Sequence, residues 1–84
     1  MDKGEVRTFI IDRLKKKLLL FDIAEEEVKD GFDLVKSGLL DSMAFVDLVA
    51  GVEEEFDLEI DFEKAADTED FTSLGGLVQI IMDA

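Results

Sequence analysis

Ser42 is the residue of this chain whose type and position best suit covalent chemistry. It lies in "GLLDSM", residues 38–43, where two leucines precede an Asp-Ser pair. Asp and Ser both favour the position before a helix, where a side-chain oxygen accepts a hydrogen bond from a backbone N–H. A helix N-terminus also suits a phosphodiester, because the helix dipole stabilises negative charge there. Two interpretations therefore compete: Asp41 or Ser42 is only a helix cap, or the Ser42 hydroxyl carries a group.

The remaining residue types exclude most enzyme chemistry. The 84 residues include no His and no Cys, so the commonest general base, a thiolate nucleophile and a zinc-thiolate site are all missing. A serine nucleophile needs an adjacent base, and the lysines are few and distant from Ser42 in the sequence. Neither "EEVKDG" nor "DFEKAAD" has the ligand spacing of an EF-hand loop. We expect no catalytic residue and no metal site, and a small hydrolase is the least favoured function.

The charge is strongly negative and unevenly distributed. The net charge is −13, yet residues 1–17 hold six basic and three acidic residues. Such a chain repels nucleic acid and anionic membranes and attracts basic partners. "KKKLLLF", residues 15–21, is far too short to span a membrane and predicts a helix end that runs into the core. With no signal peptide and no cysteine, we expect a cytoplasmic monomer without nucleic-acid partners or membrane insertion.

Three segments have apolar residues at helical spacing. A helix is predicted over residues 4–19, a second from Asp41-Ser42 to Phe56, and a third after a cap at Thr72 or Ser73. Their apolar positions are Val6, Phe9, Ile10, Leu14 and Leu18; Phe45, Val46, Leu48, Val49, Val52 and Phe56; and Leu74, Leu77, Val78 and Ile81. Gly51 inside the second helix lowers helix propensity, which close helix packing would explain.

The connections between these helices are less regular. Residues 20–41 form a long link with one short turn, and we expect Val28, Phe32 and Leu34 to fix it to the core. "DLEIDF" alternates like a strand, but no second strand signal exists to pair with it. It is interpreted as an extended linker that buries Leu58, Ile60 and, as a further candidate, Phe62. With a brief helical turn in "FEKAAD", the whole chain is predicted to be a single all-α domain, a small four-helix bundle with three longer helices and one short one.

The order of these features resembles the acyl carrier protein family. "LLDSM" is similar to that family's Asp-Ser-Leu phosphopantetheine site, with Met43 in the Leu position. The valine of "EEV" at 26–28 lies fourteen residues before the serine, and "DLVAGVEEEFDLEI" at 47–60 is similar to the acidic second helix and its exit. The Thr72 start and the apolar stripe of the last helix also fit. The resemblance covers nearly all 84 residues.

The resemblance implies a carrier domain over residues 1–84 with 4′-phosphopantetheine esterified to Ser42. A phosphopantetheinyl transferase would install this arm from coenzyme A with magnesium, and a loading ligase would place an acyl or aminoacyl group on its thiol as a thioester. A downstream acyltransferase or synthase, in lipid or secondary-metabolite biosynthesis, would then accept that group. The positions that match the family's partner contacts are Asp41, Met43, Val46, Asp47, Glu53 and Glu54.

Three departures from the fatty-acid carriers point to a specialised member. Those carriers usually have Gly and a small residue directly before Asp-Ser, whereas this chain has Leu39 and Leu40. Ala44 replaces a commonly acidic position, and Phe45 is bulky. "GLLDSM" is more similar to D-alanyl and related discrete aminoacyl carriers. The alternative function from another class is an unmodified acidic adaptor that binds a basic partner, with Ser42 acting only as a cap.

Overall fold

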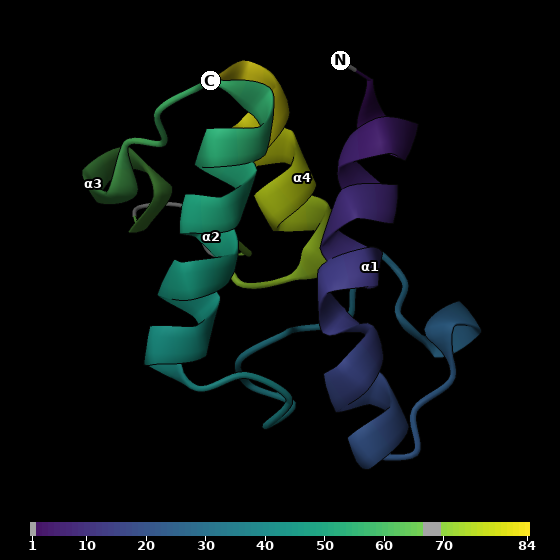
Figure 1. Ribbon diagram of the computed structural model, residues 1–84. Helices are drawn as coiled ribbons and strands as arrows, with labels where there is room; N and C mark the ends of the chain where they lie inside the picture. The colour runs from purple at the N-terminus through teal and green to yellow at the C-terminus, as the bar shows by residue number, and fades with distance from the viewer. Residues whose placement is uncertain (1, 67–69) are drawn as a thin grey trace.

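Three longer helices pack side by side and a short helix lies outside them, beside α2 (Figure 1). This computed structural model describes residues 2–66 and 70–84. The elements are α1 (Lys3–Leu20), the 3-10 helix η1 (Glu25–Glu27), α2 (Ser42–Phe56), α3 (Phe62–Ala66) and α4 (Leu74–Asp83). The described residues include no strand, only an isolated bridge between Asp33 and Ser73. The predicted small all-α bundle, with three longer helices and one short one, is confirmed.

Helix α1 forms one wall of the core. Asp2 caps it by accepting a hydrogen bond from the Glu5 backbone N–H at 2.8 Å, and the helix extends one residue beyond the predicted range at each end. Its buried residues recur every four positions and face α2 and α4; they are Val6, Ile10, Leu14 and Leu18. The predicted core stripe of α1 is therefore confirmed, apart from Phe9, which is only half-buried.

Helix α2 buries a narrower face than the sequence predicts. Phe45, Leu48, Val49 and Val52 are buried. Phe56 is half-buried, and its ring packs edge-on against Phe9 with the ring centroids 5.6 Å apart. The prediction that Val46 belongs to the core is wrong, because this side chain is 47% exposed. Val46 follows Phe45 by one residue, and that step turns the helix by about 100°, out of the buried arc.

The predicted end of α1 is also partly wrong. Leu18 enters the core, but Leu19, Leu20 and Phe21 are exposed by 82%, 79% and 51%. Helix α1 continues to Leu20. Successive helical residues point in different directions, so only Leu18 continues the buried stripe of every fourth residue. The run "LLLF" therefore leaves three large apolar side chains uncovered at the end of the helix.

The long connection from α1 to α2 is fixed to the start of α4. Val28 and Leu34 are buried as predicted, while Phe32 is half-buried. The Leu34 N–H donates to the Thr72 carbonyl at 2.8 Å, and the Leu74 N–H donates to the Phe32 carbonyl at 2.9 Å. These paired backbone bonds hold the connection across the base of α4.

Asp33 is the polar centre of this junction. Its carboxylate accepts hydrogen bonds from the Thr72 hydroxyl at 2.8 Å and from the backbone N–H groups of Lys36 at 2.7 Å and Val35 at 3.0 Å. Burial alone would raise the pKa of this carboxyl. The hydrogen bonds from Lys36, Thr72 and Val35, together with the Lys36 charge, outweigh that effect and lower the pKa below its ordinary value.

The segment after α2 is an extended linker, as predicted. Ile60 is buried and Leu58 is half-buried, but Phe62 is exposed at the first position of α3, so its candidate place in the core is wrong. The short helix expected in "FEKAAD" is confirmed over Phe62–Ala66, while Asp67 lies outside the described residues. In α4 all four predicted core residues are buried; they are Leu74, Leu77, Val78 and Ile81.

Candidate functional site

Ser42 is the first residue of α2 and is presented by an anchored segment. Leu39 and Leu40 directly before the Asp-Ser pair are both buried, and the Leu40 N–H donates to the Leu34 carbonyl at 2.9 Å. Gly38 has a φ of 87°, a left-handed conformation that glycine adopts without strain. The two leucines therefore fix the backbone from which Ser42 starts the helix.

Asp41, and not Ser42, caps this helix. The Asp41 carboxylate accepts a hydrogen bond from the Ala44 backbone N–H at 2.7 Å, and the Asp41 backbone is extended, as an N-cap requires. Ser42 is exposed, and its hydroxyl forms no hydrogen bond with any residue in the described part of the chain. Of the two candidate caps, the structure selects Asp41 and leaves the Ser42 hydroxyl accessible to another molecule.

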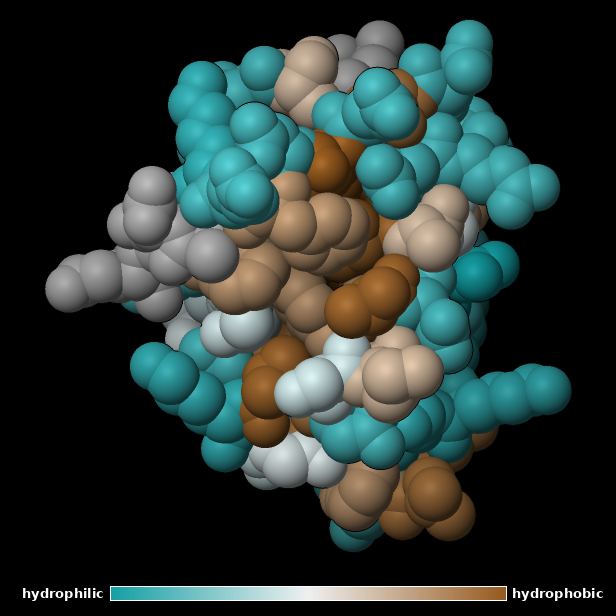
Figure 2. Space-filling model, turned by 90° about the vertical axis from the view of Figure 1, so that its left-hand side faces the viewer, coloured by the Kyte–Doolittle hydropathy of each residue, from teal (hydrophilic) through white to brown (hydrophobic). Residues whose placement is uncertain are grey.

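Apolar side chains flank this serine on the surface. Met43 is 73% exposed, and Val46 is the next exposed large apolar residue of α2. Figure 2 shows the side of the molecule formed by α2 and α3, where apolar side chains form a band bordered by hydrophilic ones. Exposed apolar groups rimmed by polar groups are typical of interaction sites.

Acidic residues line the same helix, but they are not equivalent. Asp47 and Glu54 are exposed and lie seven residues apart, on one face of α2. Glu53 is half-buried, and its Oε2 accepts a hydrogen bond from the Ile60 backbone N–H at 2.9 Å. Glu53, expected from the resemblance to contact partners, therefore also holds the linker after α2. None of the fifteen residues of α2 is Lys or Arg.

A groove with two cations borders the acidic face on the α1 side. Arg13 and Lys17 of α1 line it together with Asp47, and its volume is about 180 Å³. The Arg13 guanidinium lies 5.6 Å from the centre of the Phe9 ring. A Cβ at residue 51 would come within 2.7 Å of Arg13 Nη2, but this atom is the end of a flexible side chain that can move aside, so the contact does not by itself require glycine.

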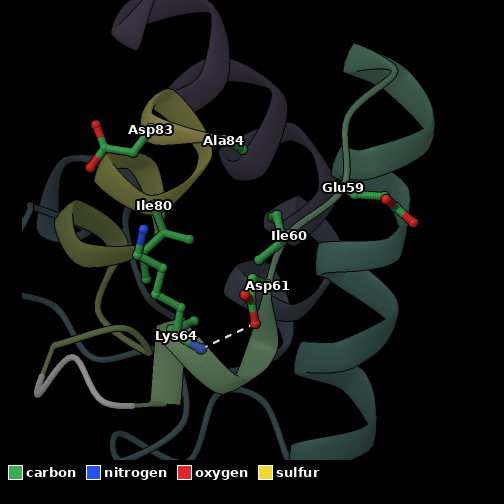
Figure 3. Close-up of a pocket in the computed structure, with 8 residues that line it drawn as sticks. Glu59, Ile60, Asp61, Lys64, Ile80, Asp83 and Ala84 are labelled. Atoms are coloured by element: carbon green, nitrogen blue, oxygen red, sulfur yellow. Dashed lines mark hydrogen bonds between the residues drawn. The ribbon is translucent and has the colours of Figure 1, made fainter.

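A second hollow, which the sequence did not predict, lies between the linker, α3 and α4 (Figure 3). Its volume is about 280 Å³, and Ile60, Ala65 and Ile80 supply its apolar lining. Asp61 at its edge already accepts a hydrogen bond from the Lys64 backbone N–H at 3.2 Å. Ile80 lies one residue before Ile81 and does not belong to the predicted apolar stripe of this helix. The sequence pattern therefore did not indicate that Ile80 lines a hollow. Glu59, Asp61, Lys64 and Asp83 also line the hollow, so its apolar side chains are bordered by charged ones.

The described residues contain no group of three or more metal-ligating side chains, and no helix among them has the length and apolar character needed to cross a membrane. No model of a known protein family matches the chain, and neither a search of curated proteins nor one of solved structures found a match. The arrangement around Ser42 offers an accessible hydroxyl at a helix start, exposed apolar neighbours and an acidic surface. It is suited to being modified and bound by another protein.

Proposed function

We propose that this protein is a discrete acyl or aminoacyl carrier, with 4′-phosphopantetheine attached to Ser42. The observation that best supports this proposal is that Asp41, and not Ser42, caps α2. Asp41 satisfies the Ala44 N–H, so the fold does not need the Ser42 hydroxyl as a cap. The hydroxyl is exposed on a backbone fixed by two buried leucines. An enzyme could therefore reach it without unfolding the helix.

The position also suits the group that would be attached. A phosphodiester on Ser42 would add negative charge at the N-terminus of a fifteen-residue helix, where the dipole is favourable. When attached, phosphopantetheine supplies a thiol at the end of a flexible arm. The chain itself has no cysteine, so thioester chemistry would depend entirely on this group. The protein's own part would be to present the cargo.

The surface of α2 would form the docking site for the enzymes that act on the carrier. Asp41, Asp47 and Glu54 would attract basic partners, since opposite potentials raise the rate of encounter. Met43 and Val46 are the exposed apolar contacts beside the serine. In the order of the reactions, these partners would be a phosphopantetheinyl transferase, a loading ligase, and an acyltransferase or synthase.

The alternative function is an unmodified acidic adaptor. The absence of Lys and Arg from α2 supports it. A helix whose charged residues are all acidic can bind a basic partner without any cofactor. In that case binding by the apo protein would survive Ser42→Ala and would weaken as salt screens the charges. The carrier proposal instead requires that the serine hydroxyl be modified.

Intact-protein mass spectrometry tests the carrier proposal. The protein is incubated with coenzyme A, magnesium and a broad-specificity phosphopantetheinyl transferase, beside Ser42→Ala and the control Ser37→Ala. We expect the wild type and Ser37→Ala each to gain one phosphopantetheine unit and Ser42→Ala to gain none. No gain in the wild type, or an equal gain in Ser42→Ala, would sink the proposal. Circular dichroism of all three proteins checks that each is folded.

A further inference from the structure

Met43 directly follows Ser42 and has the most exposed large apolar side chain of α2. It is 73% exposed, compared with 47% for Val46. The carrier proposal uses both side chains only as apolar contacts for partner enzymes. The thioether of Met43 differs from the other apolar groups of this surface, because an oxidant can convert it to a polar sulfoxide.

The composition of the chain leaves few places where such oxidation can occur. Peroxides oxidise the sulfur atoms of Cys and Met, and the chain has three Met and no Cys. Met82 in α4 is half-buried and packs against the core, and Met1 lies outside the described residues. Among the residues that the structure describes, Met43 is therefore the sulfur-containing side chain most accessible to an oxidant in water.

The oxidation needs only a peroxide and is reversible. The thioether sulfur donates a lone pair to one oxygen of hydrogen peroxide, the O–O bond breaks and an S–O bond forms. The departing hydroxide takes up a proton and leaves as water. A methionine sulfoxide reductase reverses the change with two thiol groups. These thiols become a disulfide, and the sulfoxide oxygen leaves as water.

Oxidation of this side chain would change the surface and leave the fold intact. Met43 lies outside the buried core, and the cap of α2 is the Asp41 carboxylate, which a peroxide does not alter. A sulfoxide replaces a flexible apolar contact with a polar one, which disrupts interfaces that depend on methionine. We propose that Met43 is a reversible oxidation site that regulates the docking of partner enzymes at Ser42. This inference rests on the proposed carrier function.

Peptide mapping by mass spectrometry tests the oxidation site. The protein without phosphopantetheine is treated with hydrogen peroxide, because the thiol of an attached arm would also react. The reaction is stopped at intervals with free methionine, and the protein is digested. We expect the sulfoxide of Met43 to form several-fold faster than that of Met82. Equal rates at the two residues would overturn the assignment of the site.

The kinetics of phosphopantetheine transfer test the effect on docking. Oxidised and untreated wild type, freed of peroxide, are incubated with coenzyme A, magnesium and a broad-specificity phosphopantetheinyl transferase. We expect kcat/KM to fall roughly tenfold on oxidation, since one apolar side chain buried at an interface contributes on that scale. The change should lie in KM, because the Ser42 hydroxyl itself is unchanged. Treatment with methionine sulfoxide reductase and dithiothreitol should restore the original value.

Met43→Leu and Met82→Leu are the matched variants for this measurement. Each is compared with its own untreated sample, so the ratio of the two rates reports only the effect of peroxide. Met82→Leu should be as sensitive to peroxide as the wild type, whereas Met43→Leu should be insensitive although it retains Met1 and Met82. Equal sensitivity of Met43→Leu would contradict the proposal. Circular dichroism of the oxidised wild type should match that of the untreated protein, and a loss of helix would show that oxidation acts through the fold instead.

The untreated wild type distinguishes a failure of this inference from a failure of the carrier proposal. If the untreated protein gains no phosphopantetheine, the carrier proposal fails, and regulation by Met43 fails with it. If transfer to Ser42 is equally fast with Met43 oxidised and reduced, the carrier proposal stands and the oxidation proposal alone is refuted.

Discussion

Ser42 and Ser73 stand at the starts of α2 and α4, and their hydroxyls have opposite surroundings. Ser73 is 7% exposed, donates to the Asp70 carbonyl at 2.6 Å and accepts from the Gly76 N–H at 3.0 Å. Ser42 is exposed, and its hydroxyl has no partner within residues 2–66 and 70–84. Ser73 is itself the N-cap of its helix, whereas at α2 that role belongs to Asp41.

The comparison separates a structural serine from an available one. Both serines occur where helix-start preferences would place them. At α4 the preceding residue is Thr72, whose hydroxyl donates to Asp33, so Ser73 must cap the helix. At α2 the residue before Ser42 is Asp41, whose carboxylate accepts the hydrogen bond from the Ala44 N–H and so caps the helix. A serine displaced from capping by its neighbour is free to serve another purpose, which is the basis of the carrier proposal.

We expect the largest loss of stability from a substitution in α4, the helix that Ser73 caps. A Cβ at Gly76 would overlap the carbonyl oxygen of Asp70 and crowd Ser73 Oγ. Gly76→Ala should therefore displace the turn that caps α4, with a loss of more than about 3 kcal/mol in the free energy of unfolding. Urea denaturation measures the loss. The control is Gly31→Ala, where an added Cβ meets nothing within 4 Å; a loss of equal size there would refute the explanation.

The next effect concerns Asp33, which ties the long connection to Thr72. Asp33→Asn replaces an accepting oxygen with an N–H₂ group that faces other donors, and should cost about 2 kcal/mol at pH 7. Glu59→Gln, on an exposed side chain of the linker, is the control and should cost little. Thermal or urea unfolding of both variants provides the comparison.

The pH dependence of Asp33 follows from its lowered pKa. The folded pKa lies below the ordinary value of 3.8, so the unfolded chain binds more protons in the window between the two values. The Asp33 contribution is then complete above the unfolded pKa and is lost as the pH falls through the folded pKa. Asp33→Asn should make the decline in stability below about pH 5 shallower than in the wild type. If the decline in stability at acid pH were the same in Asp33→Asn and the wild type, this carboxylate would not stabilise the fold.

Ser73→Ala should lower the free energy of unfolding by less than Gly76→Ala or Asp33→Asn. It removes the N-cap of α4 and the donor to the Asp70 carbonyl, and we expect a loss of about 1–2 kcal/mol. Ser73→Thr keeps the hydroxyl and should recover part of that loss, because threonine also caps helices. Urea denaturation of the two variants decides the matter, since equal losses would show that packing, and not the hydroxyl, accounts for the effect.

The sequence predicted most of this fold because its core residues recur at a regular spacing. Every fourth residue of α1 is buried from Val6 to Leu18, and periodicity detects such a stripe directly. The same method failed for Val46 and for Leu19, Leu20 and Phe21 at the end of α1. Apolar type indicates that a residue could be buried, but only the packing of neighbouring elements decides which side of an apolar run is covered.

The candidate site was predicted only up to the choice between two adjacent caps. Asp41 and Ser42 have similar helix-start preferences, and nothing in "DS" says which oxygen reaches the Ala44 N–H. The Asp33 junction could not be predicted either, because Thr72 is thirty-nine residues away in the chain. The bond from Glu53 to the Ile60 N–H depends on how the linker folds back on α2. Such contacts are set by tertiary structure and leave no local pattern.

The smallest expected effect gives the sharpest test of the comparison. Asp41→Ala removes the cap of α2 and should cost about 1 kcal/mol, whereas Ser42→Ala should change the free energy of unfolding by less than about 0.5 kcal/mol. Urea denaturation of the two variants, with Ser73→Ala as the reference for a structural serine, measures both values. If Ser42→Ala cost as much as Asp41→Ala, the hydroxyl would contribute to the helix start and the argument from its availability would fail. If the order holds, loss of modification in Ser42→Ala can be attributed to the missing oxygen, because the fold around it is unchanged.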